Sequence, residues 1–344
     1  MGHTMRFHII DPFRDALSHP ETIMSAFFWC CNQRLQWHHN ADIWHLRFHW
    51  ASIQPKLLLA LHTGSYQFEP RHQHTRSSRK HTVIRAQDAV VLKAMAIALT
   101  PHIKQHVRHQ CIHLTGRGGA KAAVRAVKAR IAEYAFVLKA DINSYYARIS
   151  HSLIRTEIRR VCRSPSLSHL IAMWLAQPQT VDGEFMPPSN QGIPQGCPLS
   201  PLIGALALSP LDNALVPYCK THGLVYYRYQ DDWICLTRTR RQLRTITRKM
   251  NAVLSALNLP ISQPKTWMGR TDRGIDFLGY HIRPHHPLTL ATATQVNHTH
   301  TLIGKLDSGD WDAVDRYITH WRRWARAGLP QVTLPDSWNT SPLP

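Results

Sequence analysis

Two strand-like runs joined by a short acidic step constrain this chain more than any other feature. Residues 225–229 read VYYRY, residues 233–236 read WICL, and Gln230, Asp231 and Asp232 lie between them. Aromatic and β-branched residues favour strands, so the pattern predicts a β-hairpin with both acids at its tip. Asp is also a common turn residue, and a lone pair of this kind has two interpretations: an ordinary turn or a functional site.

The charge of the chain favours a negatively charged partner. Its 344 residues include 41 Lys and Arg against 21 Asp and Glu, a net charge of +20, and 44% of them are hydrophobic. That composition is typical of a globular protein with one sizeable core or two modest ones. The positive excess favours a polyanion such as nucleic acid. A ribosome-associated or membrane-surface protein can show the same balance, so charge alone names no function.

The cysteines and the apolar runs argue against several other classes of protein. Seven cysteines are scattered along the chain and none forms a C-x-x-C pair, so neither a zinc site nor a disulfide framework is indicated. The longest apolar runs, near residues 57–61 and 202–208, are far too short to span a bilayer. The opening residues, MGHTMRFHII, do not resemble a secretory leader. We therefore expect a soluble cytoplasmic protein with no membrane contact.

The first third of the chain combines helices with a basic segment. Apolar residues recur at helical spacing through residues 13–62. Residues 71–130 then contain thirteen Lys or Arg and a single acid, Asp88, which favours a phosphate-facing surface over an ordinary solvated one. Within that segment the pattern predicts a helix over 88–99 that ends before Pro101.

Beyond residue 134 the pattern changes to a mixture of strands and helices. Strands are expected at residues 135–140, 266–269 and 275–282. Helices are expected at residues 152–161, 202–215, 239–257 and 311–327. Asp141 follows the first of these strands, and Pro210 is expected to bend the second of these helices.

Three carboxylates are expected to meet if the strands that carry them are neighbours in one sheet. Asp141 ends one strand, and Asp231 and Asp232 lie at the turn between two others. Clustered acids repel one another unless cations neutralise them, and hard oxygen ligands suit Mg²⁺. Two such ions about 3.5–4 Å apart can activate an attacking hydroxyl and stabilise a leaving oxygen in phosphoryl transfer. In a basic chain this predicts a nucleic-acid enzyme, with three unrelated surface acids as the alternative.

Five motifs in a fixed order resemble the palm motifs of reverse transcriptases. They are FVLKADINSYY (136–146), NQGIPQGCPLSP (190–201), YQDD (229–232), LPISQPKT (259–266) and FLGY (277–280). Together they cover about 150 residues, and the bacterial branch typified by group II intron enzymes is the most similar. One acidic pair is weak evidence, whereas five ordered motifs are specific.

The resemblance implies an α+β polymerase with a right-hand fold. Residues 1–135 would form N-terminal helices and fingers, 136–283 an antiparallel-sheet palm with a fingers insertion near 161–190, and 284–344 a short helical thumb. The implied activity is RNA-directed DNA polymerisation by two-metal nucleotidyl transfer. Its cofactors would be two Mg²⁺ ions, and its partners an RNA template, a DNA or RNA primer, and dNTPs.

The resemblance also implies roles for individual residues. Asp141, Asp231 and Asp232 match catalytic carboxylates that bind the metal ions, and Lys265 matches a catalytic lysine near the triphosphate. The nucleotide-binding positions would be Tyr146, Gln195, Gly196, Arg79 and Lys80, and the primer-grip positions Phe277, Leu278, Gly279 and Tyr280. Tyr146 matches a bulky residue that crowds the sugar 2′ position and favours deoxynucleotides, with core packing as the alternative. In the thumb, the residues expected to bind the duplex are Arg322, Arg323 and Arg326.

The sequence departs from the family at one informative position and leaves other functions open. Gln230 stands where intron and retron enzymes usually have Ala, so fidelity or processivity is expected to differ. The main alternative is a catalytically silent, maturase-like RNA-binding protein, although such a protein has no electrostatic reason to keep three repelling acids. An RNA-templated RNA polymerase is a third candidate, disfavoured by Tyr146 and the FLGY motif. Antiviral defence and a retroelement are both compatible biological roles.

Overall fold

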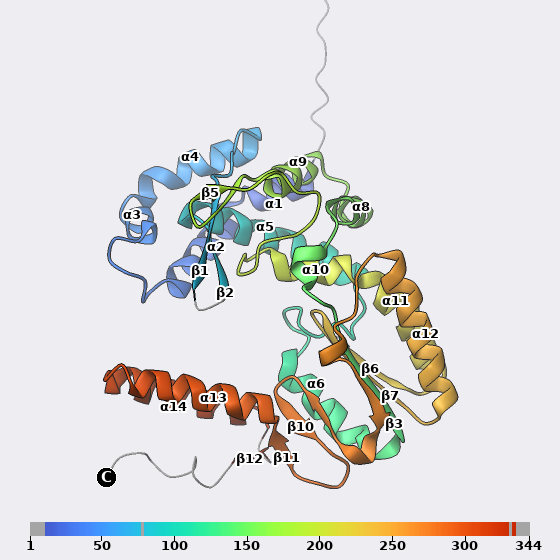
Figure 1. The fold of residues 1–344 in the computed structure, drawn as a ribbon. Coiled ribbons are helices and arrows are strands. Elements are labelled where there is room, and N and C mark those ends of the chain that lie inside the picture. Colours follow the sequence, from blue (N-terminus) through green and yellow to red (C-terminus); the bar gives the residue numbers. More distant parts are fainter. Residues whose placement is uncertain (1–10, 77–78, 330–331, 335–344) are drawn as a thin grey trace, which may run out of the picture. The chain divides into compact units, whose positions relative to one another are not determined.

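The chain folds into two compact units, each made of two separate stretches of sequence. The computed structural model describes residues 11–76, 79–329 and 332–334, with the side chains of residues 74–81 outside that description. The first unit is the chain up to Val107 together with Ser144–Ser209, and the second is Arg108–Asn143 together with the chain from Pro210 onward. Both units combine helices with sheets, so the expected α+β class is confirmed (Figure 1). The finer division into fingers, palm and thumb stays a prediction.

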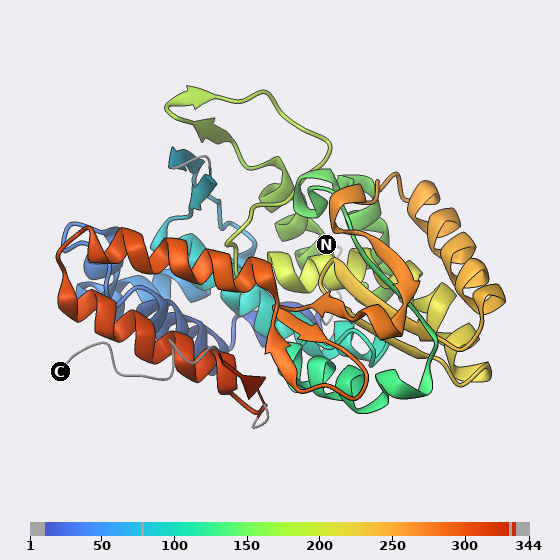
Figure 2. The same ribbon diagram turned by 60° about the horizontal axis from the view of Figure 1, so that its bottom comes forward.

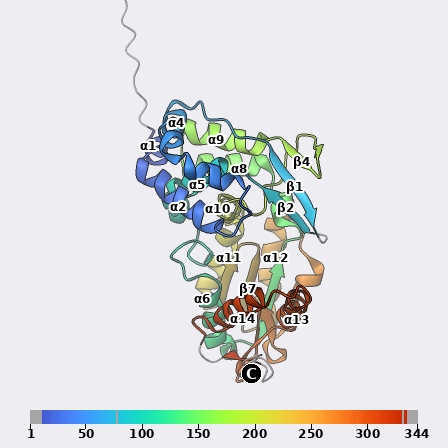
Figure 3. The same ribbon diagram turned by 90° about the vertical axis from the view of Figure 1, so that its left-hand side faces the viewer.

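The first unit is built around one long helix, α5 (Ala86–His106), which is buried over most of its length. The helices that pack around it are α1 (Pro12–Leu17), α2 (Pro20–Gln33), α3 (Asp42–Phe48), α8 (His151–Val161) and α10 (Ser200–Ala207). The remaining helices are α4 (Trp50–Thr63), α7 (Tyr145–Arg148) and α9 (Pro165–Ala176). A sheet of order β2-β1-β4-β5 lies beside these helices (Figure 3), with β1 (Arg71–Arg76), β2 (Arg79–Val83), β4 (Gln179–Val181) and β5 (Glu184–Phe185). The helices expected in 13–62 and 152–161 are confirmed.

The helix predicted to end before Pro101 continues past it to His106, so that boundary is wrong. The Thr100 hydroxyl donates to the Ala96 carbonyl oxygen at 2.6 Å inside the same helix. An internal proline costs about 3 kcal/mol because it removes a backbone hydrogen bond. Leu92 is completely buried, and burial of a side chain of this size contributes about 1.5–3 kcal/mol. Because α5 buries many such residues, packing outweighs the local preference of one proline.

The one acid of the basic segment is a buried structural residue. Asp88 on α5 accepts a hydrogen bond from the Tyr66 hydroxyl at 2.5 Å and another from the Glu69 backbone N–H at 3.1 Å. Burial raises the pKa of Asp88 to about 6, although these hydrogen bonds act in the opposite direction. Asp88 therefore fixes residues 66–69 to the core and adds almost no negative charge to the surface of 71–130.

The second unit contains the sheet that carries the acids. Its order is β6-β7-β3-β8, all antiparallel, with β3 (Phe136–Asp141), β6 (Val225–Tyr229), β7 (Asp232–Thr237) and β8 (Trp267–Arg270). α12 (Arg240–Ala256) packs on β3 and β7, and α6 (Gly119–Arg130) packs on β6. Short 3₁₀ helices are η1 (Ile131–Glu133), η2 (Gln263–Lys265) and η3 (Thr271–Arg273). The expected acidic hairpin is confirmed, and so is the helix expected after it.

A smaller sheet and a helical hairpin complete the second unit. The sheet has the order β12-β11-β10-β9, with β9 (Ile275–Phe277), β10 (Tyr280–Ile282), β11 (Leu288–Leu290) and β12 (Val332–Thr333). The helical hairpin consists of α13 (Thr292–Leu306) and α14 (Trp311–Arg326), which lie side by side (Figure 2). The strand expected over 275–282 is interrupted at Leu278 and Gly279, where the chain turns with positive φ. α13 was not expected, because it is polar and buries only His298.

Three basic side chains of α6 bind backbone carbonyls of the C-terminal elements. Lys121 donates to the Trp324 carbonyl oxygen at 2.6 Å, and Arg125 donates to that of Gly328 at 2.6 Å. Lys128 donates to the carbonyl oxygens of Arg283 and His286 at 3.0 and 2.5 Å. These three side chains therefore bind carbonyl oxygens of the protein, whereas the sequence predicted that the basic segment faces phosphates. They attach the helical hairpin and the smaller sheet to α6.

A buried ion pair joins α11 (Ser209–Thr221) to β6. Asp212 and Arg228 have fully buried side chains and meet at 2.5 Å (Nη2 to Oδ2) and 2.8 Å (Nε to Oδ1). The Tyr226 hydroxyl also donates to Asp212 at 2.7 Å, and Nη1 of Arg228 donates to the Gln230 carbonyl oxygen at 2.8 Å. The pair thus positions the turn after β6.

Among the described residues no single helix is long and apolar enough to cross a membrane, and only the bent pair α10–α11 reaches that length and composition together.

Replacement of one partner of this pair should destabilise the second unit strongly. Arg228→Met leaves the Asp212 carboxylate buried without its cation, which typically costs about 3–5 kcal/mol. The double variant Asp212→Leu/Arg228→Met removes both charges and should be clearly more stable than Arg228→Met. Urea unfolding followed by tryptophan fluorescence measures the free energy of unfolding of each variant. A double variant as unstable as Arg228→Met would contradict the charge-pair explanation.

Candidate functional site

The register of the main sheet places two of the predicted carboxylates opposite each other. β3 and β7 pair with Asp141 directly across from Asp232, and β6 and β7 pair with Tyr229 across from Asp232. Asp231 lies in the turn between β6 and β7, one residue before Asp232. The strands that carry the acids are therefore neighbours, which is the condition under which the sequence predicted that the acids meet.

The electrostatics of these acids are unfavourable to their charged forms. Burial, together with the neighbouring Asp141 and Asp231, raises the pKa of Asp232 to about 7, although Lys139 and Lys265 act in the opposite direction. Burial and the nearby Asp141 also raise the pKa of Asp231. One carboxylate oxygen of Asp232, Oδ1, is buried and accepts no hydrogen bond. A negatively charged group in such a place needs a positive partner.

Lys265 supplies part of that positive charge. It lies in η2, and its Nζ is 3.3 and 3.4 Å from the two carboxylate oxygens of Asp141. The Ser262 backbone N–H donates to the Asp141 carbonyl oxygen at 2.8 Å, which holds η2 beside the end of β3. The Lys265 side chain is 64% exposed. An exposed ion pair of this kind is worth at most about 1 kcal/mol, so a stronger cation or a phosphate can displace it.

The donor set fits a hard divalent cation. Within the described part of the chain, no three His, Cys, Asp or Glu side chains are already arranged to hold a metal ion by themselves. Mg²⁺ is usually bound by one or two carboxylates, with water and substrate phosphates completing its shell. Such an ion would give the Oδ1 atom of Asp232 a partner, and it would reduce the repulsion of Asp232 by Asp141 and Asp231. A site shared between protein and substrate is therefore consistent with the geometry.

The turn that holds Asp231 is fixed by residues from distant parts of the sequence. Gln230 has φ +57°, a left-handed conformation that costs a residue with a side chain roughly 1–2 kcal/mol. Its backbone N–H donates to Nδ1 of His113 at 3.0 Å, and its carbonyl oxygen accepts from Arg228 at 2.8 Å. The segment around Cys111 lies alongside β6, because the Ile112 N–H donates to the Arg228 carbonyl oxygen at 2.9 Å. Both backbone groups of Gln230 are thus held by the protein.

His113, Asp212 and Arg228 were missed by sequence reasoning. His113 lies 117 residues before the backbone group that it binds, and no local pattern marks it. Asp212 looks like an ordinary polar residue at the start of a helix. The sequence holds one indication of the Arg228 contact: this arginine interrupts an otherwise aromatic and apolar run, so it needs a partner if the strand is buried.

The predicted nucleotide-binding residues outside the basic segment lie together in the first unit. The Ile193 N–H donates to the Tyr146 carbonyl oxygen at 2.8 Å, which holds the loop of Gln195 and Gly196 beside α7. Tyr146 is partly exposed, and its ring packs on Gly204 of α10, where a Cβ atom would come within 2.9 Å of the ring. Gln195 and Gly196 are exposed. Their roles, including that of Tyr146 at the sugar, stay predictions.

The remaining predicted positions divide into two groups. In the FLGY motif, Phe277 and Tyr280 are buried in the core, whereas Leu278 and Gly279 form a partly exposed turn. The primer-grip role of these four residues stays a prediction. Arg79 and Lys80 begin β2, and their side chains lie outside the described part of the structure.

The raised pKa of Asp232 predicts a stability that depends on pH and on divalent cations. A carboxyl whose pKa rises on folding favours the folded state while it is protonated, so stability falls as pH rises from about 4 to about 7. Without divalent ions, the melting temperature should therefore decrease over this range, and Mg²⁺ should raise it more at pH 8 than at pH 5. Asp232→Asn should reduce both effects. Thermal melts over pH 5–8 test this, and an equal response in both proteins would contradict it.

The hydrogen bond from Gln230 to His113 predicts an effect on cation binding from a residue outside the acidic cluster. His113→Leu removes the acceptor, so the turn should loosen and bind Mn²⁺ several-fold more weakly in a calorimetric titration. His113→Asn places an oxygen acceptor near the position of Nδ1 and should restore most of the affinity. His109→Leu, an exposed histidine in the same segment, is the matched control. Equal losses in the Asn and Leu variants would show that the hydrogen bond is not responsible.

Comparison with known proteins identifies the group to which this site belongs. Residues 70–282 match the family described as "Reverse transcriptase (RNA-dependent DNA polymerase)", a range that contains all three acids. A curated relative, Protein YkfC of Escherichia coli (strain K12), is 22% identical over an alignment of 233 residues, and the match covers 57% of this chain and 61% of that protein. The chain thus spans about three fifths of the length of the curated relative that it matches.

Solved structures also resemble parts of the chain. A partial Cas6-RT-Cas1--Cas2 complex aligns with 22% identity over 72% of this chain and 43% of its own, at a TM-score of 0.41. An apo telomerase from Candida tropicalis, truncated from its C-terminal domain, aligns with 12% identity over 58% of this chain and 46% of its own, at a TM-score of 0.45. The family match covers well over half of the sequence. The chain therefore belongs to the reverse transcriptase (RNA-dependent DNA polymerase) family.

Proposed function

We propose that this chain is an RNA-directed DNA polymerase that extends a DNA or RNA primer on an RNA template by two-metal nucleotidyl transfer. The observation that carries the proposal is the pairing of Asp141 with Asp232 across the main sheet, with Asp231 in the adjoining turn, inside the range of the family match. The net charge of +20 supports a polyanionic substrate. The same five motifs support a place in the group II intron-like branch, and we infer activity in the cytoplasm, in antiviral defence or as part of a retroelement.

The three acids would hold two Mg²⁺ ions jointly with the phosphates of a dNTP. When bound, such ions neutralise phosphate charge and lower the pKa of an attacking hydroxyl. The chain's own contribution is to fix where the carboxylates lie. Asp141 and Asp232 are held by the strand register, and Asp231 is held by a turn whose backbone binds His113 and Arg228. Such preorganisation lets the acids act without rearrangement during the reaction.

Lys265 is placed to act on the leaving group. Its side chain is largely exposed, and its ammonium group lies against the Asp141 carboxylate. Pyrophosphate gains negative charge as it leaves, so a nearby ammonium group stabilises it and can give it a proton. Tyr146, Gln195 and Gly196 keep the proposed role of contacts to the incoming dNTP. Tyr146 is partly exposed, so part of the residue is accessible to a ligand.

A silent RNA-binding protein is less consistent with the acids. Burial of Asp232 with an unpartnered oxygen, beside two other carboxylates, costs stability when no cation is bound. A chain that needed only the fold would lose nothing by replacing these acids. The presence of the three acids therefore favours an active enzyme.

The proposal predicts that loss of one acid abolishes primer extension. Wild-type protein should extend a primer annealed to RNA with dNTPs and Mg²⁺, and Asp231→Asn should reduce the rate far more than tenfold, because a ligand of the metal centre is lost. A tenfold loss corresponds to about 1.4 kcal/mol of the activation barrier, and a metal ligand contributes several times that.

The control for this experiment is Asp272→Asn, which removes an exposed acid from the same unit and should leave the rate unchanged. Circular dichroism of all three proteins checks that they are folded. A folded Asp231→Asn variant with more than about a tenth of the wild-type rate would contradict the assignment of Asp231.

A further inference from the structure

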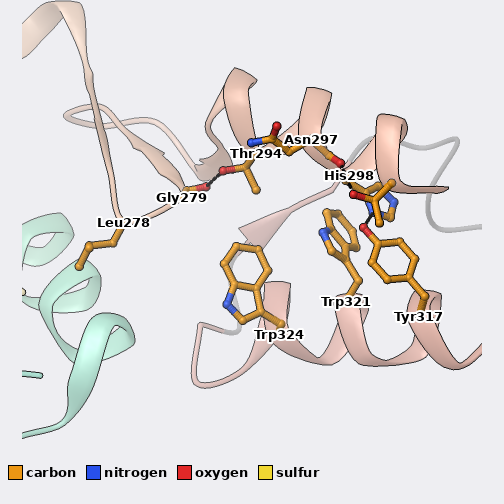
Figure 4. Close-up of a pocket in the computed structure, with 9 residues that line it drawn as sticks. Leu278, Gly279, Thr294, Asn297, His298, Tyr317, Trp321 and Trp324 are labelled. Carbon is orange, nitrogen blue, oxygen red and sulfur yellow. Dashed lines mark hydrogen bonds between the residues drawn. The ribbon is translucent and has the colours of Figure 1, made fainter. Parts of the chain in front are cut away.

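A cavity of about 410 Å³ lies between the two helices of the C-terminal hairpin and the turn of the FLGY motif (Figure 4). Four of the side chains that line it are aromatic: His298 from α13, and Tyr317, Trp321 and Trp324 from α14. Asn297 adds an exposed amide at its edge. The roles proposed above for the acids, the nucleotide-binding residues and Lys265 do not use this cavity.

The aromatic walls are held in place by the protein itself. The rings of His298 and Trp321 stack at 3.7 Å between centroids, and Nδ1 of His298 forms a hydrogen bond with the Tyr317 hydroxyl at 2.9 Å. Nζ of Lys121 lies 4.1 Å from the centre of the Trp324 ring and also binds the Trp324 carbonyl oxygen. At Gly279 a Cβ atom would lie 3.1 Å from the Trp324 ring, so the glycine allows the turn to approach it. A preformed site of this kind loses little entropy when it binds a ligand.

The chemistry of these walls favours a flat aromatic ligand with polar edges. Unpaired nucleobases bind proteins by stacking on aromatic rings and by hydrogen bonds along their edges. The Asn297 amide offers both a donor and an acceptor to such an edge. Burial and the nearby Arg322 lower the pKa of His298, which favours a neutral wall around the ligand.

The C-terminal half of α14 is strongly basic. From residue 316 to residue 326 the helix contains four arginines, Arg316, Arg322, Arg323 and Arg326, and no acid. Its two acids, Asp312 and Asp315, lie nearer its start. Of these arginines, Arg322 lies close enough to His298 to lower the pKa of that histidine, so positive charge that phosphates can neutralise lies near the cavity. A purely apolar ligand, such as a side chain of a partner protein, has no use for that charge.

We propose that this cavity binds one unpaired nucleobase of a nucleic-acid strand that crosses the helical hairpin. This inference rests on the proposed function, because it assumes that the chain handles nucleic acid. A base inside a duplex is stacked and paired, so it is not available to the cavity. The preferred substrate is then a duplex with a single-stranded extension, and the extension contributes affinity through its base as well as its phosphates.

The test compares three RNA–DNA duplexes in equilibrium binding: a blunt one, one with a three-nucleotide extension, and one whose extension of equal length lacks bases. Wild-type protein should bind the extension with bases about tenfold more tightly than the abasic one, which equals about 1.4 kcal/mol. Trp321→Leu and Asn297→Ala should each reduce that ratio toward one. Trp311→Leu, which removes an exposed tryptophan at the far end of α14, should keep it.

A second measurement uses only the wild-type protein, so it does not depend on the folding of a variant. An extension that carries 5-iodouracil should crosslink on irradiation to a peptide that contains Tyr317, Trp321 or Trp324. Equal binding of the base-bearing and abasic extensions, or crosslinks only to other peptides, would overturn the inference.

These results separate the cavity from the polymerase activity. Primer extension without a base-dependent gain in affinity would refute the cavity proposal alone. A base-dependent gain in a protein that extends no primer would refute the proposed function alone. Binding of an aromatic peptide in place of the extension, with no effect of the bases, would assign the cavity to a protein partner and overturn the inference.

Discussion

Arg228 and Asp212 meet in the interior of the second unit with no exposure to water, and the turn that carries Asp231 depends on their contact. A buried ion pair seldom adds net stability compared with apolar side chains of the same size, because both charges must first lose their water. Its value here is geometric. The guanidinium group has a third nitrogen, and that nitrogen binds the Gln230 carbonyl oxygen in a conformation that Gln rarely adopts alone. The buried ion pair therefore helps to hold the turn in one conformation.

This turn holds Asp231 and Asp232 at positions where the folded protein disfavours their charged forms. Burial and mutual repulsion raise the pKa of both Asp231 and Asp232, and the exposed Lys265 offsets only part of this. Sites that violate the ordinary rules of burial are typical of functional positions, because the missing partner arrives with the substrate. In the proposed reaction that partner is a pair of divalent cations bound together with nucleotide phosphates. The same burial and repulsion of the carboxylates would then lower the stability of the ligand-free protein and favour the binding of the cations.

The elements that the sequence predicted well have strong local patterns. The acidic hairpin follows from two aromatic runs around Asp231, and the ordered motifs indicate which strands adjoin it. Contacts over long sequence separations were not predictable: nothing near His113 marks its bond to the hairpin. The basic segment shows a different limit, because a count of charges does not reveal their partners, and Lys121 binds a carbonyl group of α14. The local preference of Pro101 predicted that the helix ends before it, but α5 continues to His106 because so much of the helix is buried.

Tyr146 reaches its position only because Gly204 leaves space for it. A single methyl group at residue 204 would lie 2.9 Å from the Tyr146 ring and 3.3 Å from that of Tyr145, so both rings would have to move. If Tyr146 contacts the sugar of the nucleotide, as proposed, the extent of its reach is set by a glycine on a neighbouring helix. Evolution can then adjust the choice between ribose and deoxyribose at residue 204 while the tyrosine itself stays unchanged. The choice between the two sugars would in that case depend on Gly204 as well as on Tyr146.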